Sequence, residues 1–410
     1  MCLIRIGIRQ NLFYLLMLVI FNFLRNVDSI IIDQVVGLKS SLFLTFLMFL
    51  GEFIAGITIY CYQIKFLRKS TNPKYSSFMG VKLIKPPTDI SAPDKCYKIY
   101  FLIFIISYFD FIEFTMKTFY IPKYQYISNS LPMRLGSLLT FSSAGLCYLL
   151  LRLQLYKHQI FSLLIIFICS VIILVFELII EILYNNKNII NYIYVLFLVF
   201  INHFFTSFKD VIEKYLLEYD YINAFKVLMI EGIFGCVITY IYWLFEDSLN
   251  EIKDIYEQNT FKFFLLIICF TLFAFLSAGR NAYRVLTNKL YSPMTRTLTD
   301  SILDPFLIIF YYYGEKDFTI GENDEHNIFY FLINLILSII INFWGCIYNE
   351  IIVLFFCGLE YNTHLVVSER ANINHNEEDN YIEKNEILEI REFPNYIISF
   401  QNENENNNYN

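Results

Sequence analysis

Long apolar runs, separated by short polar connections, recur along the chain as far as residue 357. An α-helix rises 1.5 Å per residue, so roughly 17–25 apolar residues are needed to cross a hydrocarbon core of about 30 Å. Ten runs meet or approach this length, and those with an internal charge or proline need protein partners in lipid. The predicted spans are residues 11–31, 42–64, 99–119, 126–150, 160–183, 191–208, 222–245, 261–279, 293–313 and 327–357.

Basic residues gather in every second connection between these spans. The connection between the second and third spans carries eight of them, from Lys65 to Lys98. The other basic connections hold Arg152 and Lys157, then Lys209 and Lys214, then Arg280, Arg284 and Lys289. The alternate connections, such as residues 245–257 and 314–327, are acidic or poor in Lys and Arg. Because Lys and Arg favour the cytosolic side, the pattern predicts that both termini are cytosolic.

The composition agrees with a membrane protein. Hydrophobic residues make up 57% of the 410 and charged residues 17%, whereas a soluble protein carries about 25% charged residues. The net charge of -7 is concentrated in a few loops and the tail, so it says little about partners. No nucleic acid is expected among them. The nine cysteines show no CxxC pair and no His/Cys metal spacing. No disulfide framework, metal or cofactor is therefore expected.

Two glutamates stand about ten residues into apolar runs, at Glu52 and Glu231. Ten helical residues reach about 15 Å, half of the hydrocarbon core. A carboxylate that faces lipid at this depth costs at least ~2.5–3.5 kcal/mol, so both are predicted to face a protein interior or a wet cavity. The alternative is a hydrogen bond to a neighbouring helix without any substrate. Four nearby glycines are predicted to allow close helix packing, namely Gly51, Gly56, Gly232 and Gly235.

Other polar residues within the spans are further candidates. Asp110 and Glu113 share a helix face at i and i+3, where they could bind a cation or a proton, or form a structural pair. Asn202 is polar at mid-span and could line a cavity or bond another helix. These residues join Glu52 and Glu231 as predicted substrate-binding positions.

A repeated pattern opens the fourth and ninth spans. NSLPMRLGSLLT (129–140) and YSPMTRTLTDSI (291–302) each place Ser, Pro-Met and Arg in the first turns. Arg134 and Arg296 would add to the positive end of the helix dipole and favour an anionic group; alternatively they reach lipid headgroups. Asp300, at i+4 from Arg296, is also assigned to the substrate site, although it could simply neutralise that arginine.

The fold class predicted from these patterns is an all-α membrane protein with ten transmembrane helices. The helices would form two inverted five-helix repeats, residues 1–184 and 185–358. A basic cytosolic loop is expected over 66–97, and the Asn- and Glu-rich residues 359–410 are predicted to be a disordered cytosolic tail. Within the tail, EKNEIL (383–388) fits an acidic di-leucine-like sorting signal, or it is a chance match in a solvated segment.

These residues resemble the drug/metabolite transporter superfamily, which includes nucleotide-sugar and chloroquine-resistance-transporter-like proteins. More narrowly, the chain is similar to the member-6-like proteins of solute carrier family 35, subfamily F. The matching positions are MFLGEF (48–53), Asp110, Arg134, Glu213-Lys214, EGIFG (231–235), Asn281, Lys289 and TRTLTDS (295–301). The polar stretch NFLRNVD (22–28), Arg280 and Arg284 depart from the pattern.

The resemblance implies an EamA-like transporter of an endomembrane, in the lysosome, endosome or Golgi, working by alternating access. Its cargo would be an organic anion such as a nucleotide sugar. The expected partners are a small-molecule substrate and the lipid bilayer, and a homodimer is compatible with the sequence. An enzyme is not expected, and no P-loop suggests ATP coupling. The alternatives are a membrane-embedded transferase, which needs clustered His and acid residues, and a non-transporting scaffold or receptor.

Overall fold

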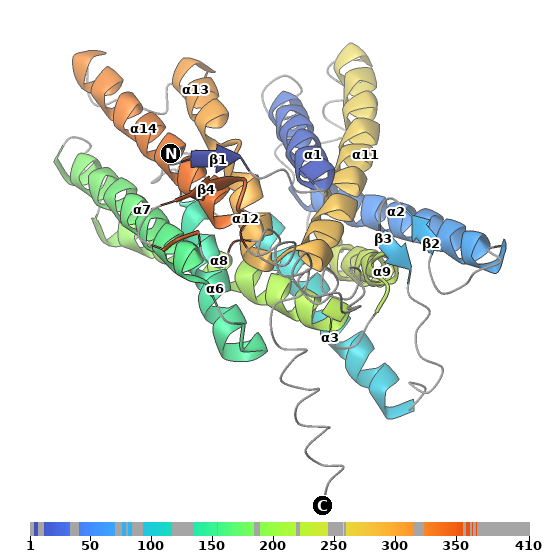
Figure 1. Ribbon diagram of the computed structural model, residues 1–410. Helices are drawn as coiled ribbons and strands as arrows, with labels where there is room; N and C mark the ends of the chain where they lie inside the picture. Colours follow the sequence, from blue (N-terminus) through green and yellow to red (C-terminus); the bar gives the residue numbers. More distant parts are fainter. Residues whose placement is uncertain are drawn as a thin grey trace, which may run out of the picture. The chain divides into compact units, whose positions relative to one another are not determined.

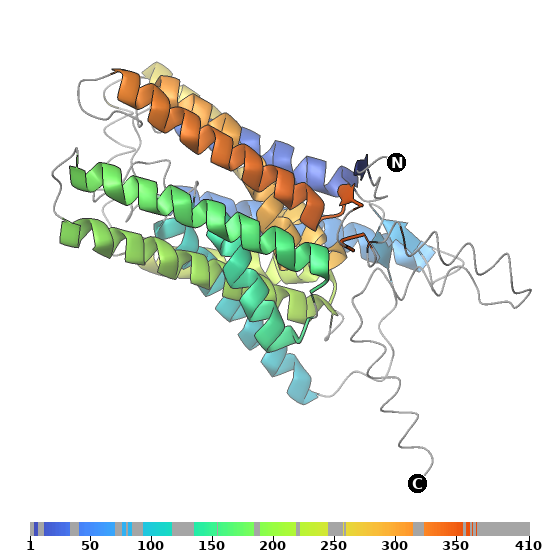
Figure 2. The same cartoon turned by 60° about the vertical axis from the view of Figure 1, so that its left-hand side comes forward.

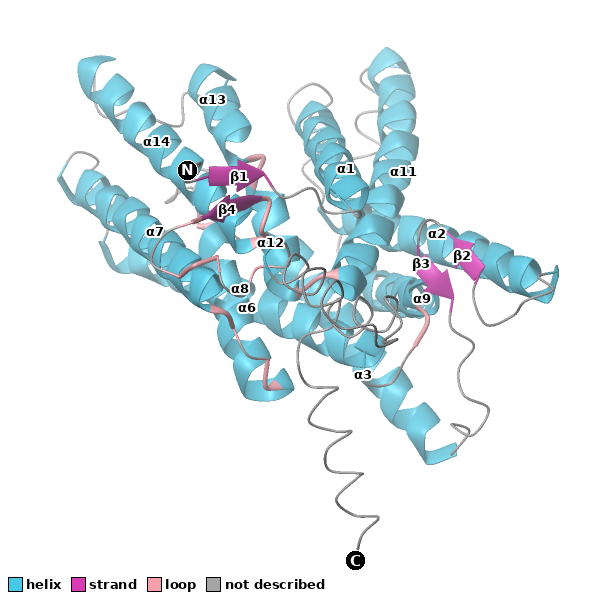
Figure 3. Ribbon diagram, in the orientation of Figure 1, coloured by secondary structure: helices cyan, strands magenta, loops and turns pink. Residues whose placement is uncertain are grey.

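The computed structural model of the protein is mostly helical (Figure 3). It describes the longer stretches that carry the helices, together with short pieces at the ends and in the connections. The described residues are 4–6, 12–32, 41–69, 76–78, 81–83, 93–116, 135–153, 155–183, 189–218, 222–244, 257, 260–314, 324–355, 358–360, 363 and 366. The segment EKNEIL and nearly all of the predicted disordered tail lie outside these residues.

The chain forms two compact units, and each contains segments from both predicted halves. Unit 1 consists of Met1–Gln10, Met133–Asn186 and Pro293–Asn410, and unit 2 consists of Asn11–Pro132 and Lys187–Ser292. The predicted repeats, residues 1–184 and 185–358, therefore do not coincide with the compact units. Their relation by inverted symmetry stays a prediction.

Unit 2 contains six of the described helices. Its helices are α1 (Leu12–Ile31), α2 (Ser41–Lys69), α3 (Pro93–Thr115), α8 (Ile189–Glu218), α9 (Ala224–Trp243) and α11 (Thr260–Leu290). Helix α2 packs closely on α9, α1 lies beside α11, and α3 contacts both α8 and α9 (Figure 1). Two short strands, β2 (Ser76–Phe78) and β3 (Val81–Leu83), pair antiparallel within the region predicted as a loop.

Glycines allow α2 to approach its neighbours closely. A Cβ atom added to Gly56 would lie 2.5 Å from the backbone nitrogen of Met229 in α9, and one added to Gly232 would lie 2.5 Å from the backbone nitrogen of Phe53. Gly51 faces the backbone of α11, and Gly235 faces the ring of Phe49. Only residues without a side chain fit such approaches. The crossing thus fixes the centres of α2 and α9 against each other.

Two apolar clusters lie on either side of these helix centres. One contains Leu18, Ile103, Val227 and Leu286, and the other contains residues such as Phe49. On α2, Glu52 lies between Phe49 of one cluster and Ala55 of the other, and on α3, Asp110 lies between Ile106 and Phe111. On α9, Glu231 lies between the buried cluster residues Ile230 and Ile238. A charged layer is consequently enclosed between two apolar layers.

Unit 1 contains the remaining described helices. They are α6 (Gly136–Leu151), α7 (Lys157–Leu183), α12 (Pro293–Ser301), α13 (Asp304–Gly314) and α14 (Asp324–Tyr348). Helix α7 packs along α14 (Figure 2), and α6 contacts α12. Strand β1 (Ile4–Ile6) pairs antiparallel with β4 (Ile352–Leu354), with Arg5 opposite Val353.

Within the described residues, seven helices are long and apolar enough to cross a membrane: α1, α2, α7, α8, α9, α11 and α14. This agrees with the predicted class of helical membrane protein, while the count of ten spans stays a prediction. The two short sheets are an addition to the predicted all-α fold.

Two predicted spans differ from the observed helices. The span over 293–313 is wrong as a continuous helix, because α12 ends at Ser301 and α13 begins at Asp304. The backbone N–H groups of Ile302 and Leu303 bond carbonyls three residues back, which tightens the turn. The span over 327–357 also ends early: α14 stops at Tyr348, and β4 follows.

Two predicted basic connections are also wrong. Helix α8 continues to Glu218 and α11 continues to Leu290, so Lys209, Lys214 and Arg284 lie within helices and are buried. The orientation predicted from positive charge therefore depends on the remaining basic connections.

Candidate functional site

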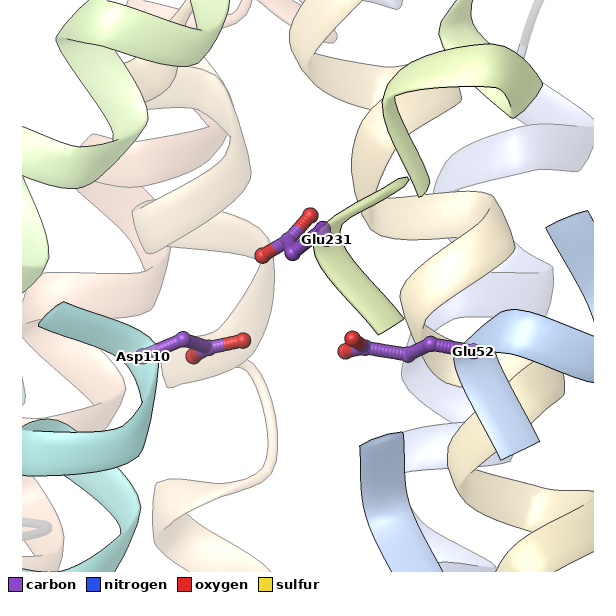
Figure 4. A group of neighbouring side chains, drawn as sticks. All are labelled: Glu52, Asp110 and Glu231. Carbon is purple, nitrogen blue, oxygen red and sulfur yellow. The ribbon is translucent and has the colours of Figure 1, made fainter. Parts of the chain in front are cut away.

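Three carboxylates from three helices converge at the centre of unit 2. Glu52 comes from α2, Asp110 from α3 and Glu231 from α9, and each lies buried. One oxygen of each lies within 4.8 Å of the others. Figure 4 shows the three side chains pointing toward one another. The structure thus brings together three of the residues predicted from the sequence.

Arg284 of α11 is the main counterion of this group. Its Nη1 donates to Asp110 Oδ2 at 3.1 Å, and its Nη2 donates to Glu231 Oε1 at 2.8 Å. The same Nη2 lies 3.9 Å from Glu213 Oε2 on α8. One guanidinium therefore connects four helices. Because Arg284 is fully buried, loss of its charge would leave these acids without compensation.

Lys209 of α8 is the second counterion. Its Nζ donates to Asp110 Oδ1 at 2.5 Å and to Glu113 Oε2 at 2.7 Å. Lys209 and Asp110 are buried, whereas Glu113 keeps 19% of its side chain exposed. The two predicted acids on α3 are thus held by one ammonium group.

Glu52 has a different kind of partner. The amide Nδ2 of Asn281 donates to its Oε1, and its Oε2 has no hydrogen-bond partner in the described part of the chain. Asn281 in turn accepts from Arg280 Nη1 at 3.0 Å, and Arg280 Nε donates to Asn22 Oδ1 at 3.2 Å. A polar chain thus links α1 and α11 to Glu52 without an ion pair to the glutamate itself.

Acids outnumber bases in this cluster, which we call the carboxylate cluster. It consists of the acids Glu52, Asp110, Glu113, Glu213 and Glu231, the bases Lys209 and Arg284, and the amide Asn281. Among the described residues the cluster has five acids and two bases, with Arg280 as a further base bonded to Asn281, so full ionisation would leave excess negative charge in a largely buried layer. Such an arrangement attracts cations and protons, and it disfavours anions.

Helical spacing positions the polar residues of α11 and α8. Asn281, Arg284 and Asn288 stand at i, i+3 and i+7, so they share one face of α11. Asn288 Nδ2 donates to the backbone carbonyl of Asp210 at 2.9 Å, which holds that face against α8. Lys209 and Glu213 are likewise four residues apart on α8.

The other predicted site residues lie elsewhere. Asn202 is buried on α8, and its Oδ1 has no hydrogen-bond partner within the residues described. Arg296 and Asp300 belong to unit 1, where Arg296 Nη2 lies 3.6 Å from Asp300 Oδ2. Arg296 is buried, and Asp300 is 23% exposed on its side chain. Arg134 lies outside the described residues.

The sequence reasoning missed the basic half of the cluster. Lys209 and Arg284 were assigned to connections, because a charge at the end of an apolar run reads as the end of a helix. Asn281 was identified only as one of the positions that carry the family resemblance. A usable signal was present, since polar residues at 277, 281, 284 and 288 continue one face of the preceding helix.

The triad does not fit a metal ion, although its oxygens are close enough to surround one. The guanidinium of Arg284 already occupies one oxygen of Asp110 and one of Glu231, and its charge repels a cation at that point. No protein-family model matches the chain, and no curated protein matches it. The function is therefore argued from the carboxylate cluster.

Proposed function

We propose that the protein is a solute transporter of the drug/metabolite type, in which the carboxylate cluster forms the centre of the transport pathway. The observation that carries this proposal is the convergence of Glu52, Asp110 and Glu231, buried carboxylates from three different helices. Ionisable groups at membrane depth are costly and are retained where a substrate, ion or proton passes. The membrane-type helices of unit 2 provide the setting.

The enclosed position of the cluster supports alternating access. Apolar clusters flank Glu52, Asp110 and Glu231 along the helices and these three acids are buried, whereas Glu113 keeps 19% of its side chain exposed. A solute would reach the layer when one apolar side opens. The close α2–α9 crossing at Gly56 and Gly232 would serve as the contact about which the helices move.

The charge of the cargo is best tested by comparing anionic and cationic solutes in the same assay. The family resemblance favours an organic anion such as a nucleotide sugar, whereas the excess of acids favours a solute that carries positive charge. We propose the latter within unit 2, because an anion would be repelled by the cluster. Membrane-embedded transferase activity receives no comparable support, since the clustered acids here are paired with Lys209 and Arg284.

The proposal is tested by uptake into proteoliposomes that contain the purified full-length chain. Labelled nucleotide sugars and labelled organic cations are compared, with protein-free liposomes as the background. We expect saturable uptake of at least one cation and a loss of about tenfold in Asp110→Asn, equivalent to ~1.4 kcal/mol. Equal rates for the wild type and Asp110→Asn would contradict the assigned pathway, and selective uptake of nucleotide sugars would contradict the cargo charge.

A further inference from the structure

Glu52 and Glu231 occupy similar positions in the sequence pattern, but their surroundings in the structure differ. Glu231 Oε1 accepts a hydrogen bond from the guanidinium of Arg284 at 2.8 Å. Glu52 accepts only from the neutral amide of Asn281, and it forms no ion pair within the described residues. Both side chains are fully buried. Their charges are therefore compensated to different degrees.

The neighbours of Glu52 do not supply the missing positive charge. Arg284 is engaged by Asp110 and Glu231, and Lys209 is engaged by Asp110 and Glu113. The titratable and charged groups that face Glu52 are Glu231 and Cys236 from α9, Asp110 from α3, Arg284 with Arg280 behind Asn281 from α11, and Lys209 from α8. Two of these groups are the acids Asp110 and Glu231, each with an oxygen within 4.8 Å of an oxygen of Glu52.

The geometry of Glu52 suits a proton. A buried carboxylate without a cation is strongly disfavoured, and neutralisation by a proton removes that cost. The Oε2 atom has no hydrogen-bond partner in the described part of the chain, and the Glu52 carboxylate as a whole points toward the other two carboxylates (Figure 4). A proton binds to a single oxygen. By contrast, Ca²⁺ requires six or more oxygen ligands and Mg²⁺ requires an octahedral set of ligands.

We propose that Glu52 holds an exchangeable proton, whereas Glu231 stays ionised against Arg284. Hydronium transfers its proton to Oε2 and becomes a water molecule, and neither group is oxidised or reduced. The carboxyl group then donates toward the oxygens of Asp110 and Glu231 instead of repelling them. The proton site itself stands independently of the transport proposal. The inference that transport is coupled to this proton rests on the proposed function.

Infrared difference spectroscopy on the purified full-length protein in lipid nanodiscs tests the site directly. A protonated carboxyl group gives a C=O stretching band that an ionised one lacks. We expect this band in the wild type, its reversible loss at alkaline pH, and its absence in Glu52→Gln. Glu231→Gln is the matched control and should keep the band. Loss of the band in Glu231→Gln but not in Glu52→Gln would overturn the assignment.

A second variant covers the case in which Glu52→Gln does not fold. Asn281→Ala keeps the glutamate and removes the donor to its Oε1, so the same band should shift without disappearing. Folding is checked by gel filtration and by helical circular dichroism. An unshifted band in folded Asn281→Ala would show that the protonated group is not Glu52.

Coupling is tested separately, on liposomes that take up a solute. We expect wild-type uptake to change with pH and uptake by Glu52→Gln to become insensitive to it. If the infrared band is present but no solute is taken up, the proton site stands and the proposed function fails. If uptake by Glu52→Gln keeps the pH dependence of the wild type, the coupling is refuted while transport remains.

Discussion

Arg284 connects the buried acids of unit 2 through one guanidinium group. It contacts carboxylates from α3, α8 and α9 and is fully buried. Removing one partner of a buried ion-pair network lowers the free energy of unfolding by more than the whole network contributes to it, because the remaining charges stay buried and unpaired. The presence of an arginine at this position is therefore explained by the acids that surround it.

Replacing this guanidinium should be strongly destabilising. We expect Arg284→Met to lower the free energy of unfolding by about 3–5 kcal/mol. Arg284→Lys should retain part of the stability, since it keeps the charge but not the planar, two-sided donor geometry. Thermal unfolding in detergent measures both. The triple variant Arg284→Met, Asp110→Asn, Glu231→Gln should recover stability over Arg284→Met, and a wild-type melting temperature in Arg284→Met would contradict the assignment.

The proton proposed for Glu52 predicts a sign for the effect of pH on stability. A carboxyl group that is protonated when folded and ionised when unfolded makes the folded state bind more protons. The free energy of unfolding then falls as pH rises through the range in which the two states differ. Melting temperatures measured from acidic to alkaline pH should fall more steeply in the wild type than in Glu52→Gln. Parallel curves would contradict the prediction.

At the scale of elements, the α2–α9 crossing depends on glycine. A methyl group at Gly56 or Gly232 would meet the backbone of the other helix, which cannot give way as a flexible side chain can. We expect Gly56→Ala and Gly232→Ala each to destabilise the protein by roughly 1–3 kcal/mol. Gly145→Ala in α6 is the matched control, because nothing in the described part of the chain, beyond the helix's own nearby backbone, lies within 4 Å of its added Cβ. Equal melting temperatures for all three variants would refute this account of the crossing.

The helix boundaries show which helix ends could be predicted from the sequence and which could not. For α1 and α9 the predicted spans agree closely with the observed helices, and α9 has clear local signals, because Asn223 caps its start and Glu246-Asp247 follow its apolar run. The predictions stopped short on α8 and α11, where Lys209 and Arg284 are stabilised by acids on other helices. A partner supplied from elsewhere in the chain is not visible in local hydropathy. The break near Ile302 depends on a local turn that the apolar pattern also hides.

At the scale of the whole molecule, each compact unit combines segments from both halves of the sequence. Matching depth alone predicted that Glu52 and Glu231 belong together, and they meet in unit 2. Their unequal compensation could not be predicted, because it arises from Arg284 and Asn281 on a third helix. The likeness of Arg134 and Arg296 at the two predicted repeats stays a prediction.

The predicted orientation can be checked without any cargo. The basic connection 66–97 should be cytosolic and the acidic connection 245–257 should lie on the opposite side. An epitope inserted at each position is probed with antibody after selective permeabilisation of the plasma membrane. We expect the first to be stained and the second to require full permeabilisation. The reverse result, or staining of both, would contradict the topology.

The central claim, that solute passes through the carboxylate cluster, is tested most directly by initial uptake rates of one transported solute in matched proteoliposomes. The comparison is between Glu231→Gln and Thr58→Val, an exposed position on α2 whose hydroxyl bonds only its own helix. The account predicts a loss of about tenfold or more, equivalent to ~1.4 kcal/mol, for Glu231→Gln and a wild-type rate for Thr58→Val. Wild-type uptake by folded Glu231→Gln would contradict it.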